Sequence, residues 1–256
     1  RRPRGWRLTR PGPVPAPLAL GARIGILGSG QLGRMSAMAA ARLGFRPHVF
    51  GPEADGPGMQ VAAARTVAAY EDTAALHGFA AAVDVVTFEF ENVPAATLAA
   101  LAGRVECRPG LKALATCQDR VAEKRFLASV GVPVAPWREV TSLEGLRAAI
   151  ADLGLPAVLK TTRMGYDGRG QAVIRAPEEA EAAFARLAPH PLVLAGFVPF
   201  THELSAVAAR GADGGVRGVR EPACRRHPGC LAGAGRRAGC GGRGGAPPGR
   251  ARGRGA

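Results

Sequence analysis

A lysine followed by a glycine-rich turn between two apolar runs limits most strongly what this chain can fold into. Residues 156–159 (Pro-Ala-Val-Leu) are apolar, residues 160–171 carry Lys160 and three glycines, and residues 172–174 (Ala-Val-Ile) are apolar again. Glycine lets the backbone approach a ligand closely and aim several N–H groups at it. The strand–turn–strand order differs from the Walker loop, whose glycines open a helix. The pattern predicts a hairpin that binds a polyphosphate, with an ordinary glycine-rich hairpin as the alternative.

A second glycine motif stands near the start of the chain. A short apolar run over 23–27 leads into 28–33 (Gly-Ser-Gly-Gln-Leu-Gly), followed by a predicted helix over 34–43. This order is typical of a βαβ unit that binds a dinucleotide, in which an acid such as Glu53 or Asp55 would hold the ribose. A tight strand-to-helix turn beside some other anion explains the motif equally well. Both interpretations stay open on these residues alone.

The pattern over 24–115 alternates strands with helices, which predicts a mostly parallel sheet covered on both faces. Helices are predicted over 72–82 and from Pro94 to about 101, and strands over 84–88 and 105–107. Glu89, Glu91 and Asn92 follow the strand over 84–88, at the edge where such sheets bind ligands. A solvated turn that caps the next helix is the alternative for these three residues.

The pattern changes near 110–118, where we place a boundary. An amphipathic helix is predicted over 119–130, carrying Arg120, Lys124 and Arg125. Beyond it the sequence predicts an α+β unit, with helices over 142–153 and 178–187 and strands over 156–159, 172–174, 192–194 and 203–208.

The positive charge of the chain belongs to its two ends. The formal net charge is +14, yet residues 24–215 sum to −1, while 1–23 hold six arginines and 216–256 hold ten. Of those last 41 residues, 33 are Arg, Gly, Ala or Pro, whose codons can consist of G and C alone. We expect both ends to be disordered and the C-terminal one to be an out-of-frame translation. A genuine Arg/Gly tail that binds nucleic acid non-specifically is the alternative.

Composition also argues against several classes of protein. No run of about 18 apolar residues exists, so no membrane span is expected, and no signal-peptide pattern is recognisable. The cysteines show no metal or redox motif, and a zinc site is not favoured; they are Cys107, Cys117, Cys224, Cys230 and Cys240. A reduced, cytoplasmic protein is the resulting expectation.

Taken together and in order, the motifs resemble the ATP-grasp superfamily and, within it, the N5-carboxyaminoimidazole ribonucleotide synthases of purine synthesis. The residues that carry the resemblance are 28–35, 87–94, 118–120 with Glu123 and Lys124, 165–171, and 196–200 with Glu203. The resemblance implies an α/β fold: a Rossmann-like pre-ATP-grasp domain over 24–115, then an incomplete α+β ATP-grasp domain over 116–215. Disordered Arg/Gly/Pro-rich ends would occupy 1–23 and 216–256.

The resemblance implies a reaction in which ATP phosphorylates bicarbonate, and the resulting carboxyphosphate carboxylates the amino group of aminoimidazole ribonucleotide. It implies ATP and Mg²⁺ as cofactors, these small molecules as partners, and a homodimer. The glycine loop of residues Gly28, Gly30, Gln31, Leu32 and Gly33 would face the ribonucleotide. Tyr166, Asp167 and Arg169 would contact the imidazole substrate and the carboxylating species. The implied ATP-binding residues are Arg120, Lys160, Gly165, Tyr166, Asp167, Gly168, Arg169, Gly170, Gln171, Ala195, Gly196, Phe197, Val198 and Glu203.

Two departures from the family pattern affect the expected activity. Ala195 stands where the family usually has a glutamate beside the adenine. Without this charge-assisted contact, the free energy of ATP binding should be weaker by about 1.5–3 kcal/mol. The acidic Mg²⁺ ligands of the family's second half are not recognisable after about 216, so no metal ligand is expected in this chain. We therefore predict an inactive or nearly inactive chain.

Three alternatives stay open. One is a nucleotide-binding remnant without chemistry, and another is a sibling carboxylase or formyl-transfer ligase of the same superfamily. The third is an NAD-dependent oxidoreductase, which would leave 160–171 unexplained.

Overall fold

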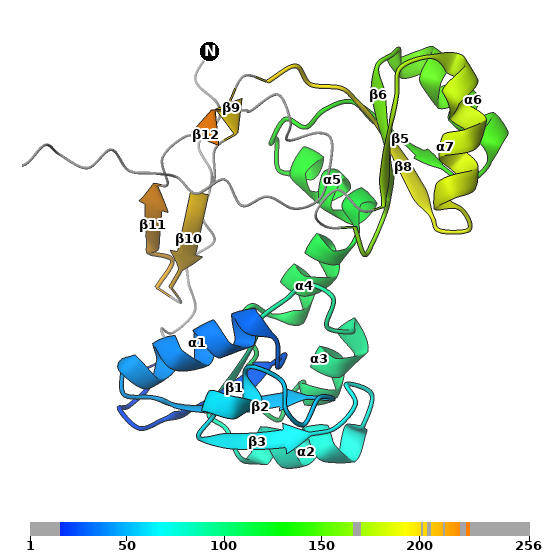
Figure 1. The fold of residues 1–256 in the computed structure, drawn as a ribbon. Coiled ribbons are helices and arrows are strands. Elements are labelled where there is room, and N and C mark those ends of the chain that lie inside the picture. The colour runs from blue at the N-terminus through cyan, green and yellow to red at the C-terminus, as the bar shows by residue number, and fades with distance from the viewer. Residues whose placement is uncertain are drawn as a thin grey trace, which may run out of the picture.

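Two four-stranded sheets, joined by a pair of helices, make up the fold (Figure 1). The computed structural model describes residues 16–165, 170–200, 202–203, 206–211, 213–220 and 224–225. Within these ranges no helix is long and apolar enough to cross a membrane.

The first unit is a parallel sheet with strand order β3-β2-β1-β4. Its elements are β1 (Arg23–Leu27), α1 (Gln31–Arg42), β2 (Arg46–Gly51), the 3₁₀ turn η1 (Met59–Val61), β3 (Ala64–Val67), α2 (Thr73–Ala81), β4 (Val85–Phe88) and α3 (Ala95–Leu101). This is the sheet that the alternating pattern predicts.

Helices cover both faces of this sheet because consecutive strand residues point to opposite sides. Ile26 and Val49 pack toward α1 with Ala37, whereas Leu27 and Phe50 pack toward α2 and α3. Gly25 brings α2 close to β1, because a Cβ at this position would lie 2.6 Å from Cζ of the buried Phe79.

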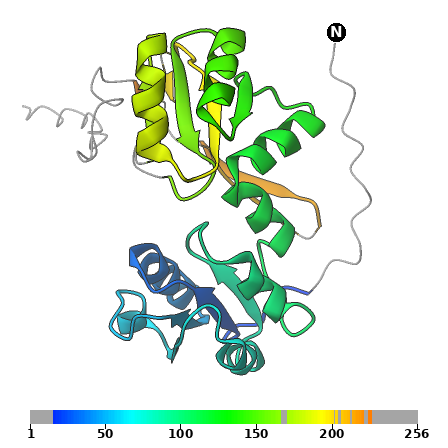
Figure 2. The same cartoon turned by 90° about the vertical axis from the view of Figure 1, so that its right-hand side faces the viewer.

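Two helices connect the units: α4 (Leu111–Gln118) and α5 (Arg120–Ser129). They run between the parallel sheet and the second sheet (Figure 2). Asp119 separates them with an extended backbone, φ −118° and ψ 119°, and its side chain accepts hydrogen bonds from the N–H groups of Val121 and Ala122. This capping starts α5 in a new direction.

The second unit is an antiparallel sheet with strand order β5-β8-β6-β7. Helices α6 and α7 pack on one face and α5 lies on the other (Figure 1). The elements are β5 (Trp137–Val140), α6 (Leu143–Leu153), β6 (Ala157–Thr161), β7 (Gln171–Ile174), η2 (Pro177–Glu179), α7 (Ala180–Leu187) and β8 (Leu192–Gly196).

Two short antiparallel pairs follow the second sheet. β10 (Ala206–Arg210) pairs with β11 (Val216–Arg220), and β9 (His202–Glu203) pairs with β12 (Cys224–Arg225). Residues 216–220 are thus a strand rather than the start of a disordered tail, because backbone hydrogen bonds to β10 need no apolar periodicity. Residues 1–15 and 226–256, where we also expect disorder, lie outside the described residues.

Most predicted elements agree with the structure to within a few residues. Ser142 caps α6 by accepting the N–H of Gly145 at 3.0 Å, and Gly154 with φ +78° ends this helix. The structure corrects two other predictions. Helix α1 begins at Gln31 rather than at residue 34. The predicted strand over 105–107 is reduced to one isolated parallel bridge, between Val86 and Cys107. The predictions also omit β3, a largely exposed edge strand, and α4, which no side chain caps.

Candidate functional site

Lys160 lies on the face of the antiparallel sheet opposite helices α6 and α7. In β6 the side chains of Ala157, Leu159 and Thr161 are buried, whereas those of Val158 and Lys160 are half-buried on the other face. The hairpin register pairs Lys160 with Gln171 of β7. The predicted strand–turn–strand order is therefore confirmed, and it brings the lysine to the mouth of the turn.

Helix α5 brings two more cations toward Lys160. Arg120 is the first residue of the helix and Lys124 is four residues further on, so both lie on one side of it. An ion pair between Arg125 and Glu139 of β5 holds α5 against the sheet. No described residue forms an ion pair or hydrogen bond with the ammonium of Lys124 or Lys160.

This arrangement places three positive charges close together, and no carboxylate of the described residues acts on the pKa of Lys160. Partial burial lowers the pKa of Lys160 from its usual value, and the charges of Arg120 and Lys124 lower it further. Burial also lowers the pKa of Lys124, with Glu123 opposing this effect and Arg120 adding to it. Repulsion among these positive charges raises the free energy of the charged lysines. An anion bound between them would therefore be stabilised.

Arg120 holds the base of the glycine hairpin through main-chain contacts. Its Nη1 donates to the carbonyl of Thr161 at 2.9 Å and its Nη2 to the carbonyl of Gly165 at 2.7 Å. Its backbone N–H donates to the carbonyl of Thr162 at 2.9 Å. The guanidinium thus fixes residues 161–165, and its other N–H groups can still meet an anion.

The two described ends of the glycine loop meet at Gly165 and Gly170. A Cβ at Gly170, where φ is +66°, would lie 2.6 Å from Oγ1 of Thr161 and 3.4 Å from Cα of Gly165. Only glycine fits this closure without displacing a neighbour. The remaining predicted loop residues, 166–169, lie outside the described residues.

The segment expected beside the adenine lies along the same face of the sheet. Ala195 of β8 pairs with Val158 of β6, and further along the same strands Val193 pairs with Lys160. The two pairs are two residues apart, which corresponds to about 7 Å along the strands. Gly196 N–H donates to the carbonyl of Pro136 at 2.8 Å and Phe197 N–H to that of Pro156 at 3.2 Å. Val198 is exposed. Glu203 lies in β9, and its side chain lies outside the described part of the structure.

The other glycine loop, 28–33, already holds an anion that belongs to the chain. The carboxylate of Glu89, just after β4, accepts the N–H of Gly30 at 2.9 Å and the N–H of Gly33. It also lies against Gly28, where a Cβ would come 2.1 Å from its Cγ. Glu89 therefore occupies the helix N-terminus where a dinucleotide would place its pyrophosphate.

Further contacts close the space beside this loop. Gly51, Gly56 and Gly58 all approach Ser29, which is buried, and the N–H of Gly58 donates to its carbonyl at 2.7 Å. Burial raises the pKa of Tyr70 to about 12, with the charges of Glu89 and Glu53 contributing. These contacts argue against a dinucleotide site.

The structure brings together the predicted residues Arg120, Lys160, Gly165, Gly170 and Gln171. Loop 28–33 belongs to the other unit, with Gln31 and Leu32 opening α1. The ATP-binding residues implied by the resemblance do not include Lys124, although its spacing from Arg120 could have identified it. Glu89 lies at the predicted ligand edge, but no sequence pattern shows its bonds to Gly30 and Gly33. Among the described residues, no group of three or more His, Cys, Asp or Glu side chains lies close enough together to hold a metal ion.

Comparison with known families assigns both units. Residues 21–118 match the ribonucleotide synthetase preATP-grasp domain, and residues 125–227 match the ATP-grasp domain. Fold and site therefore define an ATP-grasp protein, as the sequence motifs predict. The second match includes residues 216–227, which the sequence analysis assigns to the tail.

Individual relatives narrow the assignment. The N5-carboxyaminoimidazole ribonucleotide synthase of Brucella melitensis is 48% identical over 198 residues, which are 77% of this chain and 55% of that protein. The chain belongs to the N5-carboxyaminoimidazole ribonucleotide synthase family, and it spans about half the length of the curated relatives it matches.

Two solved structures show the same fold. The Staphylococcus aureus N5-carboxyaminoimidazole synthetase complexed with ADP aligns with a TM-score of 0.77 at 33% identity, covering 83% of this chain and 57% of the other. The Aspergillus clavatus enzyme, in complex with ADP and 5-aminoimidazole ribonucleotide, aligns with a TM-score of 0.71 at 27% identity, covering 78% and 52%.

Proposed function

We propose that this chain binds ATP through Arg120, Lys124 and Lys160, and that it provides the nucleotide-binding part of a ligase that carboxylates 5-aminoimidazole ribonucleotide. One observation carries the proposal: three cations lie beside a glycine hairpin, and no described carboxylate balances Lys160. The ADP and aminoimidazole ribonucleotide of the Aspergillus clavatus complex support the choice of ligands.

The proposed chemistry uses charge and shielding from water. ATP would transfer its γ-phosphoryl group to bicarbonate, and the carboxyphosphate formed would carboxylate the amino group of the ribonucleotide with release of phosphate. Charge on the phosphoryl oxygens is stabilised by fixed cations and backbone N–H groups. A glycine hairpin over the site would exclude water from the labile carboxyphosphate. In this proposal Tyr166, Asp167 and Arg169 contact the substrates, while loop 28–33 faces the ribonucleotide.

Binding without turnover is a second candidate, favoured by the donor groups present. The family implies Mg²⁺, yet the described residues provide no cluster of carboxylates for it, and phosphoryl transfer depends on such a metal. We therefore expect nucleotide binding with little or no phosphate release. A homodimer and a cytoplasmic location stay predictions.

Nucleotide titration of two matched variants tests the proposal. Lys160→Met removes a cation of the cluster, whereas Lys112→Met removes the exposed lysine of α4. Loss of one charge-assisted contact of about 1.5–3 kcal/mol should weaken ADP binding about tenfold to 150-fold in Lys160→Met, as measured by calorimetry. Lys112→Met should bind ADP like the parent chain.

The free chain supplies a second measurement. Burial and the charges of Arg120 and Lys124 disfavour the charged form of Lys160 and lower its pKa, so Lys160→Met should unfold at a higher urea concentration than the parent. Equal ADP affinity in both lysine variants would refute the nucleotide site. Bicarbonate-dependent release of phosphate by the 256-residue chain would refute binding without turnover.

A further inference from the structure

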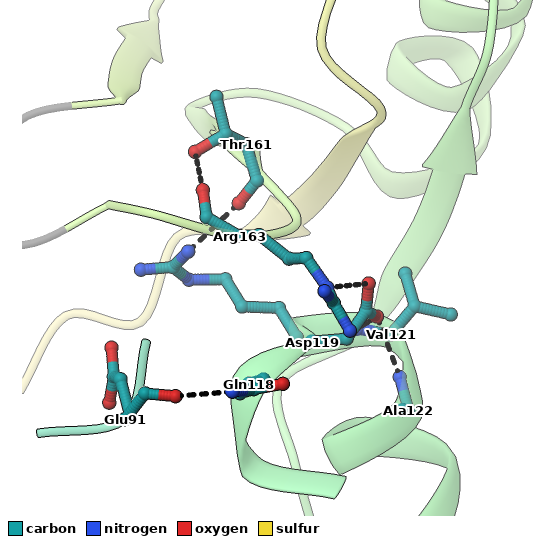
Figure 3. Close-up of polar contacts among 8 residues, drawn as sticks. Glu91, Gln118, Asp119, Val121, Ala122, Thr161 and Arg163 are labelled. Carbon is teal, nitrogen blue, oxygen red and sulfur yellow. Dashed lines mark hydrogen bonds and ion pairs between the residues drawn. The ribbon is translucent and has the colours of Figure 1, made fainter. Parts of the chain in front are cut away.

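Gln118 is a buried polar residue where the two units meet. Its side chain is 8% exposed, at the last position of α4. Its Nε2 donates to the carbonyl of Glu91 at 2.7 Å (Figure 3). The same nitrogen donates to the carbonyl of Val93. Both acceptors belong to the segment after β4, so one amide group ties α4 to the ligand edge of the parallel sheet.

The next two residues make equivalent contacts with the second unit. Asp119 caps α5 with one carboxylate oxygen, and its other oxygen lies 3.7 Å from Nε of Arg163. Arg120 donates from its backbone and from its guanidinium to the carbonyls of Thr162, Thr161 and Gly165. Three consecutive residues thus hold both units at once.

The segment after β4 continues this series of contacts into the first glycine loop. Glu89 accepts the N–H groups of Gly30 and Gly33 and stands two residues before Glu91, whose carbonyl binds Gln118. A series of hydrogen bonds and short stretches of backbone therefore joins loop 28–33 to the base of the hairpin at 161–165.

We propose that Gln118 is a positioning residue, and that Gln118, Asp119 and Arg120 form a rigid link that sets the two glycine loops relative to each other. Each member has a distinct part. Gln118 fixes the segment after β4, Asp119 fixes the direction of α5, and Arg120 fixes the hairpin base. Loosening either end is expected to affect the other, because hydrogen bonds of all three consecutive residues hold the backbone between the two ends.

This link has a purpose in the proposed function. A phosphorylated intermediate formed at the cations must meet a ribonucleotide held by the other unit, and small errors of placement are costly in such a transfer. That role rests on the proposed function, whereas the link itself is a property of the free chain. The experiment therefore uses the chain without nucleotide.

Hydrogen exchange followed by peptide mass spectrometry tests the link with variants at both ends. Gln118→Met keeps the length of the side chain and removes its donors, leaving two carbonyls without a partner. Arg120→Lys keeps the charge and removes the fork that holds Thr161 and Gly165. Gln60→Met is the matched control, because Gln60 is an exposed glutamine that bonds Asp55 and Arg34 away from the link.

We expect each link variant to exchange about fivefold faster in peptides at both ends, 26–36 and 157–165. The control should leave 157–165 unchanged, and its effect should be confined to peptides near 53–62 and to 26–36, which contains Arg34, a partner of Gln60. The proposal is overturned if Gln118→Met affects 26–36 alone, or if Arg120→Lys affects 157–165 alone. Should Gln118→Met not fold, as judged by circular dichroism, the response of 26–36 to Arg120→Lys decides the question. ADP affinity is measured separately, so a failure of the nucleotide proposal stays distinguishable.

Discussion

Replacing Glu89 with glutamine isolates the role of the internal anion at loop 28–33. Glutamine has the size and shape of glutamate, so the packing against Gly28 is preserved. The carboxylate, however, accepts two N–H groups, those of Gly30 and Gly33. An amide has one oxygen, so in Glu89→Gln one of these N–H groups faces a nitrogen donor instead.

The size of the effect follows from these contacts. A hydrogen bond to a charged group is worth about 1.5–3 kcal/mol, and the loss of one leaves a partly buried donor unpaired. A negative charge at a helix N-terminus adds about 0.3–1 kcal/mol. Glu89→Gln should therefore lower the free energy of unfolding by about 2–4 kcal/mol. At about 2–4 °C per kcal/mol for a protein of this size, the Tm should fall by about 4–16 °C.

The assay is urea and thermal unfolding followed by circular dichroism, with Glu91→Gln as the control. Glu91 lies on the same segment with an exposed side chain, so the same chemical change there should stay within about 0.5 kcal/mol. Freed N–H groups should also let inorganic phosphate stabilise Glu89→Gln more than the parent chain. The reasoning is wrong if the two variants lose equal stability, or if phosphate stabilises them equally.

Three smaller predictions concern backbone and burial. Met164 has φ +61° and is 70% exposed, so Met164→Asn, which tolerates this conformation, should raise the urea midpoint by an amount equivalent to about 0.5–1 kcal/mol. Gly25→Ala should cost about 1–3 kcal/mol in urea unfolding because a Cβ there overlaps a buried ring, whereas Gly78→Ala, with open space in α2, should gain about 0.5–1 kcal/mol. Burial, aided by the charge of Arg23, lowers the pKa of His48. The unfolded chain therefore takes up a proton first as pH falls below about 6.5, and stability should decline there. In His48→Gln, urea midpoints measured from pH 7.5 to 5.5 should decline less steeply.

The parts of the fold that the sequence predicts well are those with strong local signals. Ser142 and Gly154 mark the ends of α6 because capping and left-handed glycine act within a few residues. By contrast, β3 and α4 have little local signal, and β11 is paired by backbone hydrogen bonds that composition does not show.

The residues of the candidate site also differ in how well the sequence predicts their roles. Lys160 stands at the start of the glycine-rich segment, so the sequence alone predicts a phosphate contact there. The roles of Glu89 and Gln118 depend on partners 56 to 59 and 25 to 27 residues away, respectively. Such contacts are set by how β4, α1 and α4 pack together, and no spacing rule within one segment predicts them.

The two glycine-rich loops have opposite electrostatic surroundings, so we expect opposite ligand preferences. At 28–33 the chain supplies its own carboxylate, Glu89, so the N–H groups are satisfied before any ligand arrives. At the hairpin the neighbouring described charges include Arg120, Lys124 and Lys160, and the pKa of Lys160 is lowered by burial and then by the charges of Arg120 and Lys124. An added polyphosphate would be repelled by the first loop and attracted by the second. We therefore expect the sign of the nearest fixed charge, rather than the number of glycines, to decide which loop binds a nucleotide.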